Sequence, residues 1–202
     1  MTETAAMTRE STFAAARKAM IDSQLRTSGV NEDFVLARMG SVAREDFVPE
    51  AARSYAYMDR AITLADGSKL AAPVVHGKML AEAKPTPEDK VLVVDGGSGY
   101  MPALLAPLVG SVETITPDEA VAKTRKRGDF TLLVIDGAVE QLPDTLVKRL
   151  ADGARVVTGL SAGGVTRIAV GRKTGDTLAL LPVADIGIPH LAAFDVAKGW
   201  SF

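Results

Sequence analysis

The hydrophobic pattern of the chain changes near residue 85. Before that point apolar residues recur at helical spacing, and after it short apolar runs alternate with helical patterns. Four consecutive apolar residues, 91–94, predict a strand that is buried on both faces, as in a parallel sheet. Further strands are predicted at 112–116, 130–135, 155–160, 165–172 and 177–183, the last two flanking a hairpin turn at 173–176.

Helices dominate the N-terminal part of the prediction. Phe13, Met20 and Leu25 recur near helical spacing and predict a helix over 12–27, after a polar stretch, 1–10, that we expect to fray. Asn31 is the expected N-cap of a second helix. Further helices are predicted at 74–83, 101–109, 117–126 and 142–150.

This order of elements predicts an α/β fold. Strands that alternate with helices favour a parallel sheet covered on both faces, and the final hairpin adds antiparallel strands at one edge. We therefore expect a three-layer, Rossmann-like sandwich with a mostly parallel sheet. Residues 1–84 would form a helical extension and 85–202 the α/β core, together making one compact domain.

A glycine-rich turn follows the first buried strand and precedes a helix whose first turn contains Pro102. A ligand can approach the backbone N–H groups of such a turn closely, and the start of the helix favours an anionic group. The turn consists of Asp95, Gly96, Gly97, Ser98, Gly99 and Tyr100.

Four interpretations of this turn compete. It matches the dinucleotide pattern G-x-G-x-x-G poorly, and Tyr100 stands where a G-x-S-x-G nucleophile elbow needs its last glycine. The loop that binds S-adenosylmethionine in methyltransferases, commonly G-x-G-x-G or G-T-G-S-G-Y, fits from Gly97 to Tyr100. A strand-to-helix turn without a ligand is the fourth interpretation.

Composition narrows the function classes. The chain has 202 residues, 47% of them hydrophobic, and a net charge of −2, so it has enough apolar residues for a core and no overall attraction to nucleic acid. It has no cysteine, which excludes disulfides, thiolate zinc sites and a cysteine nucleophile. Its two histidines leave few ligands for a metal ion. No apolar run approaches the ~20 residues of a membrane span, and the N-terminus does not read as a secretory signal. We expect a cytoplasmic protein without a membrane or nucleic-acid partner.

Several motifs, taken in order, resemble the protein-L-isoaspartate O-methyltransferase family over residues 20–171. The segment 20–30 resembles that family's N-terminal helix, 43–49 its V-P-R-x-x-F-V-P signature, and 56–59 its A-Y-x-D. The strand and glycine turn, 91–100, resemble its V-L-E-I-G-T-G-S-G-Y, and 142–146 and 153–157 resemble its I-P-x-x-L and G-G-R-L-V. The order of separate motifs makes the resemblance more specific than any one of them.

The resemblance implies a class I methyltransferase fold that uses S-adenosylmethionine to methylate isoaspartyl carboxylates in damaged proteins, a repair function. A carboxylate with a pKa near ~4 is already ionised at pH 7, so no catalytic general base is expected. Rate would come from alignment of the reacting atoms in a dry pocket. The resemblance places the cofactor at Asp95, Gly96, Gly97, Ser98, Gly99, Tyr100, Thr116 and Asp136, and the substrate at Lys69, Leu70, Ala71, Ala72 and Pro73.

The chain departs from the family at the cofactor and substrate sites. Ala71 and Ala72 replace a serine and a glutamine of the family's G-x-T-I-S-Q-P segment, and Thr116 stands where a glutamate would hold the ribose. Only thirteen residues, 117–129, separate two strands between which the family has a helix, a further strand and an adenine loop. We therefore expect a shortened, divergent member that lacks one edge strand and has weakened or lost cofactor binding.

Two other function classes remain open. Ser98, Asp136 and His190 occur in the chain order of a hydrolase triad, although the elbow is incomplete. A non-catalytic binding or regulatory protein is the other, with Trp200 and Phe202 in the tail as core or dimer contacts in a homodimer. The basic run 123–127 and His76 are interpreted as a solvated helix end and a helix-face residue.

Overall fold

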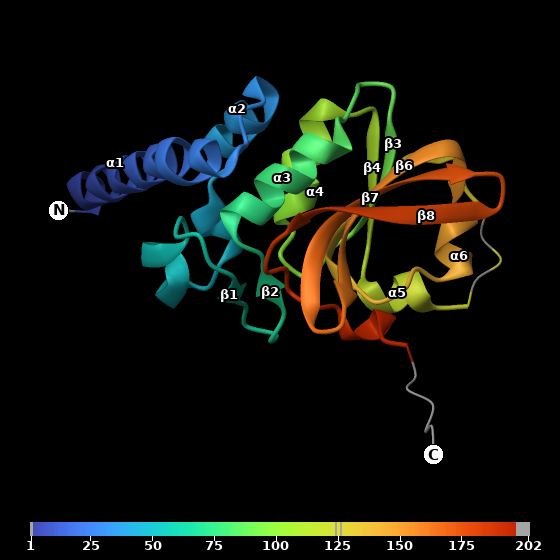
Figure 1. Cartoon of the computed structure of the whole chain (residues 1–202). Coiled ribbons are helices and arrows are strands. Elements are labelled where there is room, and N and C mark those ends of the chain that lie inside the picture. The colour runs from blue at the N-terminus through green and yellow to red at the C-terminus, as the bar shows by residue number, and fades with distance from the viewer. Residues whose placement is uncertain (1, 124, 126, 197–202) are drawn as a thin grey trace, which may run out of the picture.

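The computed structural model describes residues 2–123, 125 and 127–196 (Figure 1). Its centre is a six-stranded sheet with the order β4-β3-β5-β6-β7-β8. The first four strands in this order are parallel, whereas β7 is antiparallel to both of its neighbours, β6 and β8. The strands are β3 (Lys90–Val94), β4 (Ser111–Ile115), β5 (Phe130–Val139), β6 (Leu150–Ala162), β7 (Val165–Thr174) and β8 (Thr177–Asp185). The predicted mostly parallel sheet with a C-terminal hairpin is confirmed.

Side chains of the central strands point alternately into two cores. Val91 and Val93 of β3 lie in one apolar cluster and Leu92 and Val94 in the other. The first cluster packs against α2 (Asp33–Ser41), α3 (Pro73–Ala83) and α4 (Tyr100–Leu105), and the second against α5 (Pro117–Val121) and α6 (Asp144–Val147). Helices therefore cover both faces of the sheet, which gives the three predicted layers (Figure 1).

The order of strands in the sheet agrees with the expected loss of an edge strand. β4 is the last strand on its side, and no strand of the described residues pairs with its outer edge. The chain passes from β4 to β5 through α5, which has only five residues. Pro117 opens α5, and Thr116 caps it in a capping box with Glu119.

The N-terminal part differs from the sequence prediction. The expected fraying of 1–10 is wrong for the described residues, because α1 runs over Thr2–Met20. A π-helix, Ile21–Leu25, and a 3₁₀-helix, Arg26–Ser28, follow α1 directly. Asn31 is not an N-cap, since Glu32 takes that position and its carboxylate accepts the Asn31 N–H.

Small elements connect this part to the sheet. The 3₁₀-helices Arg44–Phe47 and Glu50–Tyr55 are followed by a two-stranded antiparallel ribbon, β1 (Ile62–Thr63) and β2 (Lys69–Leu70). Two further 3₁₀-helices lie at Ala106–Leu108 and Ala192–Phe194. The first apolar cluster contains residues from both sides of residue 84, while the proposed division at that residue stays a prediction.

Two predicted boundaries on the sheet are wrong. The helix expected at 142–150 is only the four residues of α6, because β6 already begins at Leu150. Asp136 and Gly137 do not end their strand, since β5 continues to Val139. The extension is stabilised by a late segment: the Ala138 N–H donates to the Pro189 carbonyl at 2.7 Å, and the Leu191 N–H donates to the Ala138 carbonyl at 2.8 Å. Trp200 and Phe202 lie outside the described residues.

Candidate functional site

A cavity of about 480 Å³ lies at the carboxyl ends of β3 and β4. In open α/β sheets, ligands bind beyond these strand ends. Four segments form the walls: the β1–β2 turn, the residues after β3, the start of α5, and the segment that runs into the last 3₁₀-helix. The lining residues are Asp66–Lys69, Asp95–Gly97, Thr116–Asp118 and Pro189–Ala193.

The glycines of the loop are required by close packing. A Cβ at Gly96 would lie 2.3 Å from the Asp136 carbonyl oxygen, and one at Gly97 would lie 2.4 Å from Ser68 Oγ. Gly97 and Gly99 also have φ values of +110° and +70°, which side-chain-bearing residues rarely adopt. The backbone of the loop therefore lies against the Ser68 side chain of the β1–β2 turn and against the Asp136 backbone of β5 more closely than a Cβ would allow.

Asp95 follows β3 directly and folds back over the loop. Both of its carboxylate oxygens lie 3.0 Å from the Gly99 N–H nitrogen. Burial raises the pKa of Asp95, and the nearby Asp136 carboxylate raises it further, although backbone N–H groups of the loop oppose the shift. Ser98 acts locally too, because its Oγ accepts the Tyr100 N–H at 3.1 Å.

Thr116 faces the cavity but its polar atoms belong to the cap of α5. Its Oγ1 accepts the Glu119 N–H at 3.2 Å, and the Glu119 carboxylate accepts both the Thr116 N–H, at 2.8 Å, and its hydroxyl, at 3.1 Å. Asp118 lies in the same turn and lines the cavity. It is thus the carboxylate of α5 that is placed to meet a ligand.

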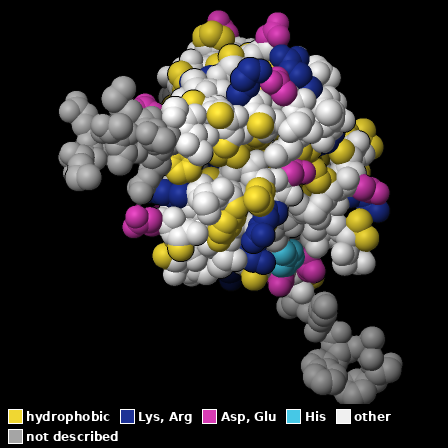
Figure 2. Space-filling view, turned by 90° about the vertical axis from the view of Figure 1, so that its left-hand side faces the viewer, with side chains coloured by type: hydrophobic (Ala, Val, Ile, Leu, Met, Phe, Trp, Pro, Cys, Tyr) yellow, Lys and Arg dark blue, Asp and Glu magenta, His cyan; other side chains and the backbone are white. Residues whose placement is uncertain are grey.

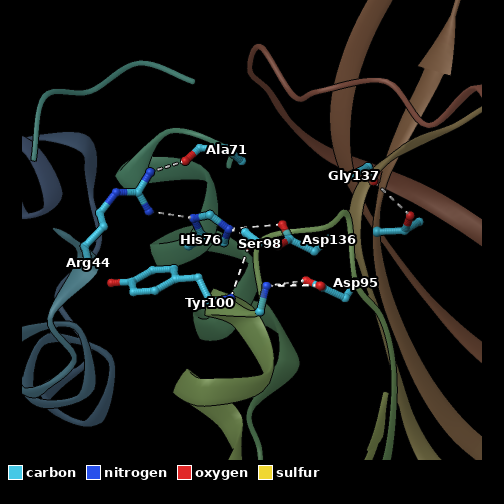
Figure 3. Close-up of polar contacts among 10 residues, drawn as sticks. Arg44, Ala71, His76, Asp95, Ser98, Tyr100, Asp136 and Gly137 are labelled. Carbon is cyan, nitrogen blue, oxygen red and sulfur yellow. Dashed lines mark hydrogen bonds and ion pairs between the residues drawn. The ribbon is translucent and has the colours of Figure 1, made fainter. Parts of the chain in front are cut away.

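A buried chain of polar side chains runs from Arg44 through His76 to Asp136 (Figure 3). Arg44 is fully buried, and its Nη1 lies 3.3 Å from His76 Nδ1. The other ring nitrogen of His76, also fully buried, lies 3.0 Å from the Asp136 carboxylate. Arg44 also donates to the Ala56 carbonyl at 2.7 Å and to the Ala71 carbonyl. The chain joins the N-terminal part, α3 and β5.

Tyr100 lies under this chain at the start of α4. Its ring is fully buried, with the Arg44 guanidinium 5.0 Å from its centroid and the His76 ring edge-on at 5.1 Å. The Phe47 ring also packs edge-on against the Tyr100 ring, with the ring centroids 5.2 Å apart. Tyr100 therefore supports the loop from below and does not line the cavity.

The predicted cofactor residues separate into two groups. Asp95, Gly96, Gly97 and Thr116 line the cavity. Ser98 lines a second, neighbouring cavity, which is described below. Gly99, Tyr100 and Asp136 line neither of these two cavities.

Most of the predicted substrate residues are withdrawn from the surface. Lys69 lines the cavity, whereas Leu70, Ala71 and Pro73 are buried and Ala72 is half-buried. Ala71 is a structural contact, because its carbonyl accepts a bond from Arg44.

A second cavity, of about 470 Å³, lies on the other side of the β1–β2 turn. The 3₁₀-helix that ends at Phe47 and the chain leading to the turn supply apolar walls, and Gly97 and Asp66 line both cavities. Its lining residues are Asp46–Pro49, Leu64–Asp66, Gly97 and Ser98. The two cavities thus meet at one strip of the glycine loop.

The hydrolase triad does not assemble. Asp136 pairs with His76, and His190 pairs with Asp195. Ser98 Oγ is engaged with the backbone of its own loop. The three residues share an order in the sequence but are bonded to different partners.

Sequence reasoning missed the buried chain. His76 does lie on a helix, α3, but the sequence did not show that its buried ring lies between Arg44 and Asp136. Its one available signal was the signature at 43–49, which contains Arg44. The contribution of 189–193 to the cavity had no signal, since that segment carries no recognisable motif.

The visible surface and the helices add two observations. On the face shown in Figure 2, basic, acidic and apolar side chains are interspersed, and no single charge dominates. Among the described residues, no helix combines the length and hydropathy that crossing a bilayer requires.

Comparisons with known proteins agree with this geometry. A protein-L-isoaspartate O-methyltransferase of Herpetosiphon aurantiacus is 34% identical over 165 residues, covering 70% of this chain and 74% of the relative. One from Aeropyrum pernix is 36% identical over 191 residues, covering 80% and 73%. A Plasmodium falciparum structure assigned to the same enzyme, in complex with S-adenosyl-L-homocysteine, has a TM-score of 0.70 at 16% identity over 90% of this chain and 98% of that one, which supports the fold.

The match to a family profile is the most direct finding. Residues 15–127, more than half of the chain, match the profile of protein-L-isoaspartate(D-aspartate) O-methyltransferase (PCMT). The matched range includes the glycine loop, the signature at 43–49 and the ribbon that walls the cavity. The chain therefore belongs to the protein-L-isoaspartate O-methyltransferase family.

Proposed function

We propose that this chain binds S-adenosylmethionine in the cavity beside Gly96 and Gly97 and methylates isoaspartyl carboxylates, with a lowered affinity for the cofactor. The observation that carries the proposal is the cavity itself, which opens at the glycine loop of a methyltransferase fold. A trimmed scaffold whose crevice had been filled by side chains would offer no such space. The same observation favours an enzyme over a purely structural relative.

The residues around the cavity fit the cofactor. Its volume of about 480 Å³ lies within the ~300–1,000 Å³ typical of small-molecule sites. S-adenosylmethionine carries two cationic groups, a sulfonium and an ammonium, and the cavity is lined by the carboxylates of Asp66, Asp95 and Asp118. The Asp118 carboxylate would accept hydrogen bonds from the ribose hydroxyls. The backbone at Gly96 and Gly97 would lie against the methionine part of the cofactor.

The lowered affinity follows from the cap of α5. Thr116 and Glu119 bond to one another, so Asp118 is the remaining carboxylate of that turn that lines the cavity. A hydrogen bond to a charged group is worth ~1.5–3 kcal/mol, and each 1.4 kcal/mol is about tenfold in affinity. The loss of one such bond would raise a micromolar dissociation constant to roughly tens or hundreds of micromolar.

The chemistry asks little of the protein beyond positioning. Bound S-adenosylmethionine supplies an electrophilic methyl group. The acceptor carboxylate is ionised at neutral pH, so no side chain has to remove a proton. The second cavity would hold the acceptor peptide, because it meets the first at Gly97 and Asp66, and Lys69 with the chain through Pro73 would support the wall between them.

Two measurements test this function. Calorimetry with S-adenosylmethionine should give a dissociation constant between about 10 and 500 µM, and Asp118→Ala should weaken it about tenfold or more. The matched control is Asp176→Ala, an exposed carboxylate in the β7–β8 turn, which should bind as the wild type does. Labelled methyl should then transfer to an isoaspartyl peptide and not to its aspartyl isomer. Absence of binding at millimolar cofactor would refute the proposal.

The place of action belongs to the same proposal. A cytoplasmic enzyme acting on damaged proteins is consistent with a chain without cysteine, and fractionation of cells expressing the tagged protein would test it. A homodimer stays a prediction from the sequence.

A further inference from the structure

The carboxylate of Asp95 has two neighbours of different kinds. On one side it accepts the Gly99 N–H with both oxygens at 3.0 Å, and on the other it lines the cavity. Loop N–H groups between a strand and a helix ordinarily favour an anionic ligand. Here the chain supplies the anion itself, so a ligand carboxylate or phosphate at this point would meet a negative charge and an engaged donor.

The position of this carboxylate is well defined. Asp95 is anchored at both ends, because its own N–H donates to the Ile115 carbonyl of β4 at 3.0 Å while its side chain is held by Gly99. The residue is only partly exposed, and charge interactions are stronger where water is partly excluded. A cation in the cavity would therefore interact with a fixed and incompletely screened charge.

We propose that Asp95 makes this cavity select the sulfonium form of the cofactor over its neutral thioether product, S-adenosylhomocysteine. The inference rests on the proposed function, since it concerns the same cavity. The two ligands differ by one methyl group and one positive charge. A carboxylate that is already held by the loop adds attraction for the charge without having to reorganise, and it leaves the binding of the thioether almost unchanged.

The selection would depend on pH with a defined sign. The pKa of Asp95 is raised above 3.8 by burial, with a further contribution from Asp136. The preference for the sulfonium should therefore be present where Asp95 is ionised and disappear as the pH falls through this raised pKa. Other titratable groups surround Asp95: Asp66, Lys69, Asp118 and His190 line the cavity with it. Outside the cavity lining, Asp136 raises its pKa and His76 lowers it.

The test compares both ligands on wild type and Asp95→Asn by calorimetry. The amide oxygen of Asn can still accept the Gly99 N–H, so the loop is preserved while the charge is removed. The wild type should bind S-adenosylmethionine about tenfold more tightly than S-adenosylhomocysteine at pH 7.5, and in the variant the ratio should fall to about one with the thioether affinity unchanged. Thermal unfolding of the variant checks that it is folded, and Asp176→Asn serves as the matched control.

Each outcome separates this inference from the proposed function. A ratio that is the same in wild type and Asp95→Asn, with S-adenosylmethionine still bound, overturns the inference and leaves the function in place. An equal loss of both ligands in a folded variant also overturns it, because that pattern indicates a structural role. A wild type that binds neither ligand overturns both. A ratio that declines with acid in the wild type and stays flat in the variant supports the assignment to Asp95.

Discussion

Replacement of Arg44 by methionine should be among the most destabilising single changes in this chain. Arg44 is fully buried and donates to two backbone carbonyls, those of Ala56 and Ala71, and it lies 3.3 Å from His76. Methionine fills similar apolar volume but supplies no donor. The two carbonyls lose their partner, and the pair formed by His76 and Asp136 loses the cation beside it.

The magnitude follows from the cost of breaking a buried charge network. Removal of one partner of a buried ion pair costs about 3–5 kcal/mol, because the remaining groups stay desolvated. A domain is stable by only ~5–15 kcal/mol in total. For a chain of this size each kcal/mol is about 2–4 °C in Tm, so Arg44→Met should lower Tm by roughly 6–20 °C.

Equilibrium urea denaturation, followed by circular dichroism, measures this loss. The matched control is Arg172→Met, since the Arg172 guanidinium donates to the Gly153 carbonyl at an exposed site and its loss should cost within about 0.5 kcal/mol. The m-value should be unchanged if both proteins unfold in a two-state manner. A loss for Arg44→Met below about 1 kcal/mol would refute the reasoning, because it would mean that the buried network is not coupled to stability.

Two further predictions concern other buried contacts. Burial would raise the pKa of Asp89, but hydrogen bonds from Thr131, Thr86 and Arg155 outweigh it and lower the pKa below 3.8. The stability that this carboxylate contributes is therefore present above 3.8 and lost as the pH falls through the lowered pKa, so urea midpoints of wild type and Asp89→Asn should differ at pH 7 and converge in acid. Gly137→Ala should cost about 1–3 kcal/mol, because its Cβ would lie 2.4 Å from the Leu191 side chain; a double-mutant cycle with Leu191→Ala should recover part of this loss, and strict additivity would contradict the contact.

The shortened edge of the sheet is compensated by a distant segment. The sequence predicted that the shortened connection between β4 and β5 would cost the chain one edge strand and weaken cofactor binding. In the structure, Leu191 packs against Gly137 and Gly96, and the last 3₁₀-helix lies against α5. The cavity beside the glycine loop is therefore closed on one side by residues 189–193, far along the chain from the deletion.

The elements that the sequence determined are those encoded locally. Apolar runs such as 91–94 and the glycines of the loop restrict the backbone locally, so strands, helices and the glycine turn could be predicted in order. The family motifs then supplied the layout of the sheet. The sequence predicted helix ends and short helices less accurately. The length of α6 and the N-cap of α2 differ from the prediction, because both depend on contacts with neighbouring elements.

Only the tertiary structure decided which polar groups meet. His76 and Asp136 are 60 residues apart, and their contact depends on how α3 packs across β5. The contacts of Ser68 with Gly97 and of Leu191 with Gly137 also depend on tertiary packing, and no local sequence pattern predicts them. The sequence gives the chemical type of each side chain. Its contact partner depends on the order of the strands and the packing of the helices, which involve residues from the whole chain.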